Sequence, residues 1–411
     1  MIAPGRRCGR AASATLAIAW LAMGCSSDSA TQRGDPPTAG KQPSLSCPAS
    51  SCDWQKLRVP QLGVTMSMTG MAALASDDIW LSGRAGAGWS KPRPGVDATW
   101  APALDHNVIL HWDGARWRRI SLPHVTSPLT QLAATPSSRV WALAGEHVVE
   151  YDGRRWSEAR PHLPPLGASG EIGLAVDRTG AWLATTRGTR TGNHPWTARW
   201  DGRHWHPVVT PGIGNQSGLT AVASASPADA WVFGFHDTLA GPVSDTTKLS
   251  GLLIEHWDGR RWGITPQPVY HNSKRSFFVA DAVMVSPTEG WAVGSQTYAG
   301  GGRVHPLVLH YDGRSWSIMR FPYCCAGAVL TAIASRGGEV WVAGTGSGPA
   351  GYQTLIDRWS GGRWIREPSL DLGGTQSADI DITPSGSVLV LATGQNQDGT
   401  SYPLLQRWTG P

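Results

Sequence analysis

The chain is organised around a short motif that recurs along almost its whole length. It consists of an aromatic residue, Asp-Gly or Ser-Gly, two further residues and Trp, and it ends in an incomplete copy at 407–411. The six complete copies are HWDGARW at 111–117, EYDGRRW at 150–156, RWDGRHW at 199–205, HWDGRRW at 256–262, HYDGRSW at 310–316 and RWSGGRW at 358–364. An Asp-Gly pair between alternating segments indicates a tight hairpin, because a two-residue type I′ turn needs φ > 0 at both central positions. Each copy therefore predicts a β-hairpin with a type I′ turn.

A second constant piece precedes each hairpin. It is an alternating apolar run, a short polar turn and a strand that usually opens with Trp, as in 219–223, 226–229 and 231–234. The strand-opening positions are Trp80, Trp141, Trp182, Trp231, Trp291, Trp341 and the aliphatic run 388–391. Four strands every 41 to 61 residues is the period of a propeller blade. The sequence thus predicts an all-β, seven-bladed β-propeller.

The incomplete seventh copy predicts how the ring closes. A closed ring cannot leave its last blade short of a strand, and 54–60 matches the fourth strands of other copies without three strands before it. We expect this N-terminal segment to pair beside 404–408. The seventh blade would then hold three C-terminal strands and one N-terminal strand, a 3+1 velcro closure.

The N-terminal region indicates export. Residues 1–24 contain three Arg, then an apolar stretch, then Leu21-Ala-Met-Gly-Cys25, which resembles a bacterial lipoprotein signal peptide and implies lipidation of Cys25. A plain secretory signal is the alternative, whereas the apolar run is too short for a transmembrane helix. Residues 25–46 are rich in Ser, Asp, Thr, Pro and Gly, which predicts a flexible tether before a propeller at 47–411.

The remaining cysteines agree with export. Once Cys8 and Cys25 are set aside, four cysteines allow three pairings. In a propeller, a residue before a fourth strand and one after a fourth strand lie on opposite faces, too far apart for a disulfide. We therefore predict one bond between Cys47 and Cys52 and one between Cys324 and Cys325, and the same separation argues against a four-cysteine metal site.

Loop lengths predict which face carries function. The turns between strands 1 and 2 and between strands 3 and 4 are short and uniform, while the connections on the opposite face vary widely in length. Aromatic residues gather in those variable connections and could stack on sugars or anchor a protein. The candidate ligand-binding residues are Trp89, Trp100, Tyr270, Tyr298, Tyr323, Tyr352 and Tyr402. The alternative is that each ring packs within its own loop.

Catalysis is the competing interpretation of the same face. His and Asp residues in the variable connections could supply acid–base groups, but no spacing selects a pair and no metal or cofactor motif stands out. These residues are His106, His236, His271, His305, Asp97, Asp105, Asp237, Asp245 and Asp398. The net charge of +5 falls to +2 without the three leader arginines, which gives no support to a nucleic-acid partner.

The repeats resemble known propeller families. The order LTAIA, EVWVAG, LIDRW and GRWIREP within 330–368 is similar to the tectonin-type repeat of lectins, and Asp-Gly-x-x-Trp is similar to the Asp-box of sialidase-like propellers. The overall layout resembles Trp-rich repeat propellers of exported bacterial proteins. No sialidase arginine triad or Tyr-Glu pair can be placed, so the resemblance implies an architecture and no catalytic residues.

These observations favour a non-catalytic propeller without a cofactor, anchored to the outer face of a bacterial membrane by a lipid on Cys25. Its variable face would bind a glycan or an envelope protein. An exported glycan hydrolase or lyase and an envelope assembly scaffold are the two alternatives.

Overall fold

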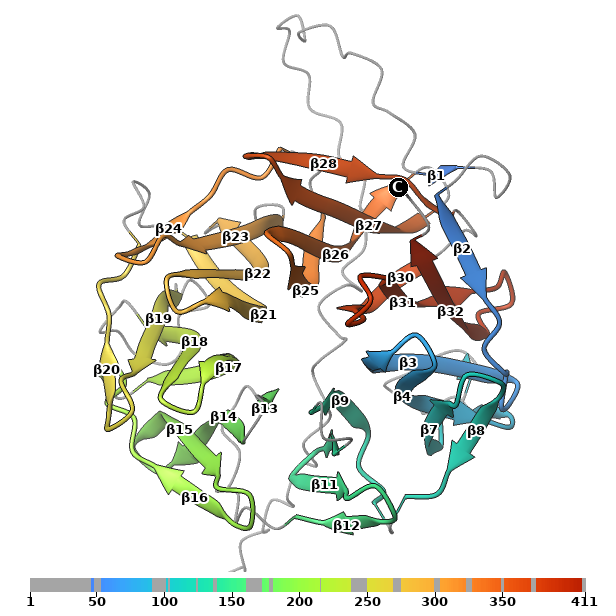
Figure 1. Cartoon of the computed structure of the whole chain (residues 1–411), viewed down its shortest axis with the longest axis horizontal. Coiled ribbons are helices and arrows are strands. Elements are labelled where there is room, and N and C mark those ends of the chain that lie inside the picture. Colours follow the sequence, from blue (N-terminus) through green and yellow to red (C-terminus); the bar gives the residue numbers. More distant parts are fainter. Residues whose placement is uncertain are drawn as a thin grey trace, which may run out of the picture.

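The computed structural model contains only β-strands among the residues that it describes, and no helix. These residues are 46–47, 53–90, 101–102, 104–122, 125–135, 139–159, 172–176, 180–214, 216–237, 250–268, 275–298, 304–322, 327–348, 351–370 and 375–408. Seven four-stranded antiparallel sheets surround a common axis, so the predicted all-β, seven-bladed propeller is confirmed (Figure 1).

We number the sheets as blades 1 to 7, with strands given from the axis outward. Blade 1 is β3 (Thr65–Ala75), β4 (Asp78–Gly86), β7 (His106–Trp112) and β8 (Trp117–Ile120); blade 2 is β9 (Leu129–Ala134), β10 (Val140–Ala144), β11 (His147–Tyr151) and β12 (Trp156–Glu158). Blade 3 is β13 (Ile172–Val176), β14 (Ala181–Thr189), β15 (Gly192–Trp200) and β16 (Trp205–Val208); blade 4 is β17 (Ser217–Ser226), β18 (Asp229–Asp237), β19 (Ser250–Trp257) and β20 (Trp262–Ile264). Blade 5 is β21 (Arg275–Ser286), β22 (Glu289–Tyr298), β23 (His305–Tyr311) and β24 (Trp316–Ile318); blade 6 is β25 (Val329–Arg336), β26 (Glu339–Gly348), β27 (Gly351–Ser360) and β28 (Arg363–Glu367).

Blade 7 combines strands from distant parts of the sequence. It consists of β30 (Thr375–Ile382), β31 (Val388–Gln395), β32 (Ser401–Trp408) and β2 (Trp54–Leu57). In the antiparallel pair of β2 and β32, Trp54 lies opposite Trp408 and Leu57 lies opposite Leu405. Two short ribbons complete the described strands, β1 (Ser46–Cys47) with β29 (Ser369–Leu370) and β5 (Trp89–Ser90) with β6 (Ala101–Pro102).

The repeated hairpins are present, but the predicted type I′ turn is wrong for the Asp-Gly copies. In blade 1, Trp112 pairs with Trp117, so four residues separate the paired tryptophans; the Asp113 N–H donates to the Arg116 carbonyl at 3.3 Å, and Gly114 has a positive φ of 86°. The Asp113 carboxylate accepts hydrogen bonds from the backbone N–H groups of Ala115 and Arg116, at 3.1 and 2.9 Å. The Asp side chain therefore holds the turn through these two hydrogen bonds.

Blade 6 is the exception that keeps the predicted turn. There the sequence is Ser-Gly-Gly-Arg, Ser360 pairs with Arg363, and both Gly361 and Gly362 have positive φ, of 57° and 79°. Two consecutive glycines allow the two-residue turn, whereas an Asp in the first position favours the longer loop.

The hydrophobic core is divided among the blade interfaces. In the cluster between blades 6 and 7, for example, Trp341, Ala343 and Ile356 pack against Ile380 and the side chains of neighbouring strands. Alternation along each strand places one set of apolar side chains against each neighbouring blade, as expected for sheets buried on both faces.

Candidate functional site

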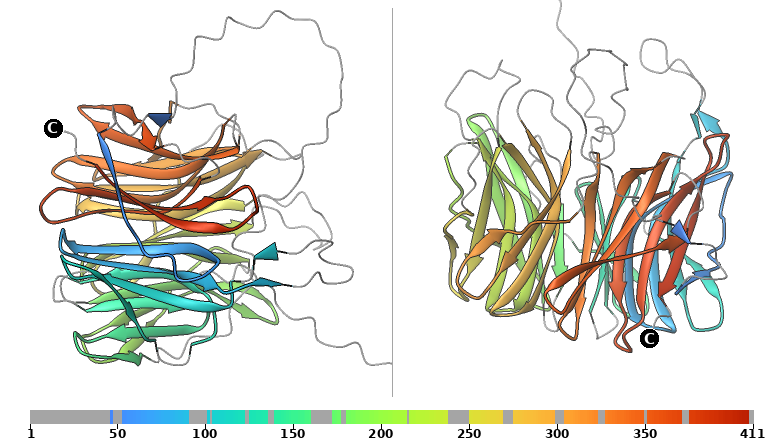
Figure 2. Two further views of the ribbon diagram at one scale, coloured as in Figure 1. Left: turned by 90° about the vertical axis from the view of Figure 1, so that its right-hand side faces the viewer. Right: turned by 90° about the horizontal axis from the view of Figure 1, so that it is seen from above.

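The two ends of the strands define two faces of the ring. We call the side of the strand 2–3 and blade-to-blade connections the variable face, and the side of the Asp-Gly hairpins the turn face. The β5–β6 ribbon, with Trp89 opposite Pro102, projects beyond the ring on the variable face (Figure 2). Tyr298, Tyr352 and Tyr402 lie at the ends of β22, β27 and β32 on this same face. The other predicted binding residues, Trp100, Tyr270 and Tyr323, lie outside the described residues.

Tyr298 is part of a polar cluster on blade 5. The Arg275 guanidinium lies over the Tyr298 ring, with 4.6 Å from Cζ to the ring centroid, and the His305 ring approaches it edge-on at 5.7 Å between centroids. Gln296 accepts a hydrogen bond from Arg275 at 3.0 Å and donates one to the Pro306 carbonyl. All four side chains are half-buried, so the cluster presents an ordered cation and an imidazole beside an aromatic ring.

Tyr402 and Tyr352 make contacts within their own blades. A Cβ atom at Gly394 would lie 2.2 Å from Tyr402 Cζ, so the glycine makes room for the ring, and the Lys56 ammonium lies 5.8 Å from the ring centroid. Burial raises the pKa of Tyr402 above its ordinary value. Tyr352 is half-buried in β27, opposite Ser347. No ring contact among the described residues joins the three tyrosines, so the structure does not gather them into one pocket.

The candidate catalytic residues that the structure describes are also spread over several blades. His106 pairs with its neighbour Asp105 at 2.7 Å, and Asp398 accepts a hydrogen bond from the Thr400 hydroxyl at 2.6 Å. Nδ1 of His236 lies 3.4 Å from the Asp237 backbone carbonyl oxygen. Within the described ranges, no three His, Cys, Asp or Glu side chains are grouped so that they could hold a metal ion. His271, Asp97 and Asp245 lie outside those ranges.

The turn face repeats one aromatic contact at six of the seven blade interfaces. The Trp that opens strand 2 packs against the two hairpin aromatics of the next blade, with centroids 4.7 to 6.2 Å apart. The sets are Trp80 with Tyr151 and Trp156, Trp141 with Trp200 and Trp205, Trp182 with Trp257 and Trp262, Trp231 with Tyr311 and Trp316, Trp291 with Trp359 and Trp364, and Trp341 with Trp408 and Trp54. At the seventh interface Leu389 takes the place of the Trp. These rings hold the blades together, and most of their surface is used in that contact.

An acid–base pair accompanies this Trp in most blades. The acid stands two residues before the strand-2 Trp, and the base stands on strand 3, directly opposite that Trp. The pairs joined by a hydrogen bond are Asp78 with His111 at 2.9 Å, Asp229 with His256 at 2.9 Å and Glu339 with Arg358 at 2.7 Å. In blade 5, Glu289 accepts from the Trp291 indole at 3.4 Å, and its charge opposes the burial that lowers the pKa of His310.

Blade 2 carries the same pair with the charges exchanged. Arg139 occupies the position of the acid and Glu150 that of the base, and the two form an ion pair. Burial raises the pKa of Glu150, an effect that the positive charge of Arg139 opposes. Because the charges are exchanged together, the ion pair is a unit of the repeat and not two independent residues.

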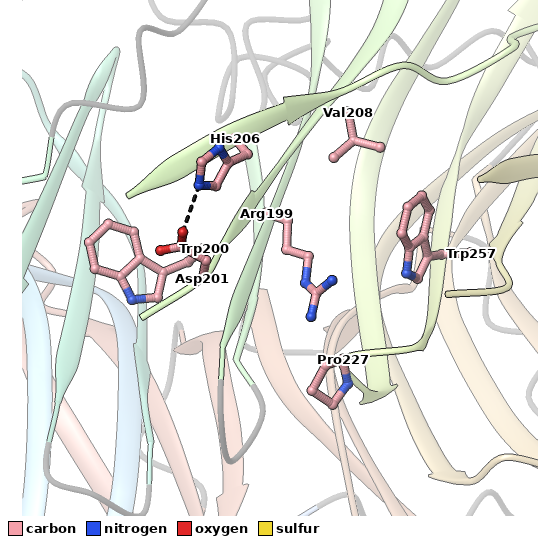
Figure 3. A pocket seen from close by; sticks show the side chains of 7 residues that line it. All are labelled: Arg199, Trp200, Asp201, His206, Val208, Pro227 and Trp257. Carbon is pink, nitrogen blue, oxygen red and sulfur yellow. Dashed lines mark hydrogen bonds and ion pairs between the residues drawn. The ribbon is translucent and has the colours of Figure 1, made fainter. Parts of the chain in front are cut away.

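Blade 3 breaks this pattern. Gly180 stands at the acid position, while the base Arg199 is retained opposite Trp182. Within the described part of the chain, Arg199 has no carboxylate partner, and its guanidinium lies 5.9 Å from the Trp182 ring centroid. The guanidinium lines a cavity of about 460 Å³ between blades 3 and 4 (Figure 3). The other lining residues are Trp200, Asp201, His206, Val208, Pro227 and Trp257.

Polar side chains on the innermost strands join other pairs of blades. Equivalent positions are occupied by Gln131, Asp281 and Asp379. Each lies opposite the residue two positions after the strand-2 Trp, or after Leu389 in blade 7. Each accepts a hydrogen bond from a backbone N–H of the next blade: Gln131 from Leu174 at 2.9 Å, Asp281 from Ile333 at 2.9 Å and Asp379 from Met71 at 2.8 Å. Desolvation raises the pKa of Asp281 to about 7, and desolvation together with the charges of Asp281 and Asp381 raises the pKa of Asp379 well above its ordinary value. These bonds to the backbone indicate a structural role.

The predictions on lipidation and disulfides stay predictions. Cys25, Cys52, Cys324 and Cys325 lie outside the described residues, and for Cys47 only the backbone is described, in β1 opposite Leu370. No helix in the described ranges is long and apolar enough to cross a membrane.

Sequence reasoning missed the cavity beside Arg199. The signal was available, because aligning the blades on the strand-2 Trp sets Gly180 against Asp78, Asp229, Glu289 and Glu339. The pairing between the acid position and the strand-3 base becomes visible only when both are seen on adjacent strands.

Comparisons with known proteins show the fold. No family model matches the chain, and no curated protein does. Virginiamycin B lyase from Staphylococcus aureus, in complex with quinupristin, is similar with a TM-score of 0.54 and 12% identity, over 86% of this chain and 98% of that chain. A protein of unknown function from Dyadobacter fermentans is similar with a TM-score of 0.50 and 12% identity, over 86% and 98%. At these identities the likeness concerns the architecture alone.

Proposed function

We propose that the protein is an exported, membrane-anchored and non-catalytic propeller whose variable face binds a glycan or an envelope protein. The observation that supports this is the contrast between the two faces. The turn-face aromatics are committed to blade interfaces, whereas the variable face carries a projecting ribbon with Trp89 and the Arg275–Tyr298–His305 cluster. A rigid ring that presents irregular, aromatic and cationic elements on one side suits recognition.

Binding is tested with the propeller domain on a glycan array and by cross-linking to envelope proteins in intact cells. We expect a bound glycan or partner to be lost in the Trp89→Ala, Trp100→Ala and Tyr298→Ala variants. Arg154→Ala, an exposed substitution on the turn face, is the matched control and should bind normally. Equal binding by all four variants would refute the assignment of the face.

Export and anchoring rest on the leader and on Cys25. We expect mass spectrometry of the N-terminal peptide to find a diacylglyceryl group on Cys25, and Cys25→Ala to release the protein from the membrane fraction. A Cys25 thiol that is unmodified in membrane-associated protein would contradict the anchor. The hydrolase or lyase alternative requires turnover of a chromogenic glycan panel, and the scaffold alternative requires a co-purifying assembly machine.

We also infer that the pairing of β2 with β32 locks the ring. Trp54 supports this, because it is only 3% exposed and its ring meets the Trp341 ring of blade 6 edge-on at 6.2 Å. Deleting residues 1–58 should leave β32 as a bare edge strand and lower the denaturation midpoint, with aggregation of the product. Deleting only residues 1–46 is the control, and equal stability of the two products would exclude the lock.

A further inference from the structure

We propose that the cavity between blades 3 and 4 is a binding site for a small carboxylate, which pairs with Arg199 as the acidic residue of other blades pairs with its base. The site lies on the turn face, away from the variable face, and is independent of the function proposed above. The repeat itself indicates the ligand. In blades 1, 4 and 6 the base on strand 3 is met by a carboxylate at 2.7 to 2.9 Å, and in blade 3 glycine has no side chain to offer.

The charge in the cavity favours an anion. Among the described residues, Asp201 is the one carboxylate that lines it, and its oxygens are engaged by the backbone N–H groups of Arg203 and His204, at 2.8 and 2.7 Å, and by His206 Nε2 at 2.7 Å. These bonds hold the pKa of Asp201 far below its usual range. No carboxylate in the described part of the chain occupies the Arg199 guanidinium, and its planar array of N–H donors matches a carboxylate in bidentate geometry.

The walls set the shape of the ligand. Trp257 supplies indole surface, and Val208 and Pro227 add aliphatic surface, around a volume of about 460 Å³. This volume lies in the usual range for small-molecule pockets. Figure 3 shows the Arg199 guanidinium pointing into the space between Trp257 and Asp201, above Pro227. A flat apolar body with one carboxylate fits this combination, and phenylacetate is a suitable probe.

Blade 7 provides an internal control. It also lacks the acid, because Ser387 stands at that position, but its base Arg407 reaches the Ser76 carbonyl oxygen at 3.5 Å. Arg407 therefore has an acceptor from the protein, whereas Arg199 has none among the described residues.

The experiment is calorimetric titration of the propeller with phenylacetate and with the neutral isostere phenylacetamide. We expect the acid to bind and the amide to bind at least about tenfold more weakly, since only the acid forms the charged pair. Arg199→Gln should lose the preference for the acid, and Arg407→Gln should keep it. The near-ultraviolet circular dichroism of each variant shows whether the Trp packing is intact.

The Gly180→Asp variant places a carboxylate at the position where blades 1, 4 and 6 have one. We expect this variant to raise the melting temperature and to abolish phenylacetate binding, as the new carboxylate occupies Arg199. If Gly180→Asp does not fold, the Arg199→Gln titration decides alone. The proposal is overturned if wild type does not bind phenylacetate, if acid and amide bind equally, or if Arg199→Gln binds like wild type.

Discussion

The turn face and the variable face are formed by the two ends of the same strands, but the turn face repeats its contacts from blade to blade and the variable face does not. On the turn face, one Trp contact recurs at six interfaces and one Asp-centred hairpin recurs in five blades. On the variable face, the described contacts differ between blades, such as Arg275 on Tyr298 in blade 5 and Tyr402 over Gly394 in blade 7. The repeated contacts therefore maintain the ring, and the variable face differs from blade to blade. We expect substitutions on the turn face to lower stability and substitutions on the variable face to lower binding.

The largest effect is expected for the turn-face Trp. Trp341 is 1% exposed and contacts both Trp54 and Trp408, so Trp341→Ala should cost about 3–5 kcal/mol of stability. Trp341→Leu should cost less, because Leu389 fills the equivalent position at the seventh interface. Chemical denaturation followed by far-ultraviolet circular dichroism measures both. A loss below about 1 kcal/mol for the alanine variant would show that the ring does not depend on these contacts.

A buried glutamate links the stability of a variable-face connection to pH. Glu255 is fully buried, one of its oxygens accepts from the Gly212 N–H at 2.9 Å, and burial raises its pKa to about 7. The native state therefore binds more protons than the unfolded state between the ordinary pKa of 4.5 and about 7. This contribution to stability is present below pH 4.5 and is lost as the pH rises through 7.

Glu255→Gln keeps the acceptor for Gly212 and removes the charge. We expect it to raise stability at pH 8 by up to about 3 kcal/mol and to change little at pH 4, which flattens the pH profile. Melting curves from pH 4 to 8 provide the measurement. An unchanged slope between pH 4.5 and 7 would mean that Glu255 is not the group that titrates. Asp281, whose pKa is also raised to about 7, contributes a slope of the same sign.

The fold could be predicted because its information is local and repeated. A hairpin between aromatic strands, copied at a regular spacing, fixes the strand order within each blade and the number of blades. The turn type could not be predicted in the same way. The Asp-Gly pair suits two different loops, and the choice depends on side-chain hydrogen bonds such as those of Asp113 that the pattern does not encode.

The candidate site was less predictable for a physical reason. Variable connections have no period, so the sequence places Tyr298 and Tyr402 on one face but not relative to one another. It also does not show that Gly394 receives the Tyr402 ring or that Arg275 covers Tyr298. That Arg199 lacks the acidic partner of other blades could be predicted from the sequence, but only once Gly180 was recognised as the partner position next to the neighbouring strand.

A smaller effect is expected at the hairpins. Hydrogen bonds from Arg116 and Ala115, together with Arg118, lower the pKa of Asp113 to about 2. Its contribution to stability is therefore present above pH 4 and is lost as the pH falls through 2. Asp113→Ala should lower the melting temperature at pH 7 by about 2 °C, and Ser360→Ala in blade 6 should not change it, since two glycines form that turn. Equal effects in the two blades would show that the Asp bonds do not stabilise the hairpin.

The smallest effect on stability, and the largest on binding, is expected for the blade 5 cluster on the variable face. Tyr298 and Arg275 are half-buried and contact one another at the edge of the ring, so Tyr298→Ala should cost below about 1 kcal/mol while binding to the glycan or envelope partner is lost. Tyr298→Phe keeps the ring and should retain both stability and most of the binding. If Tyr298→Ala destabilises the protein as strongly as Trp341→Ala, the cluster is part of the scaffold. The division between a maintained face and a divergent face would then not hold in blade 5.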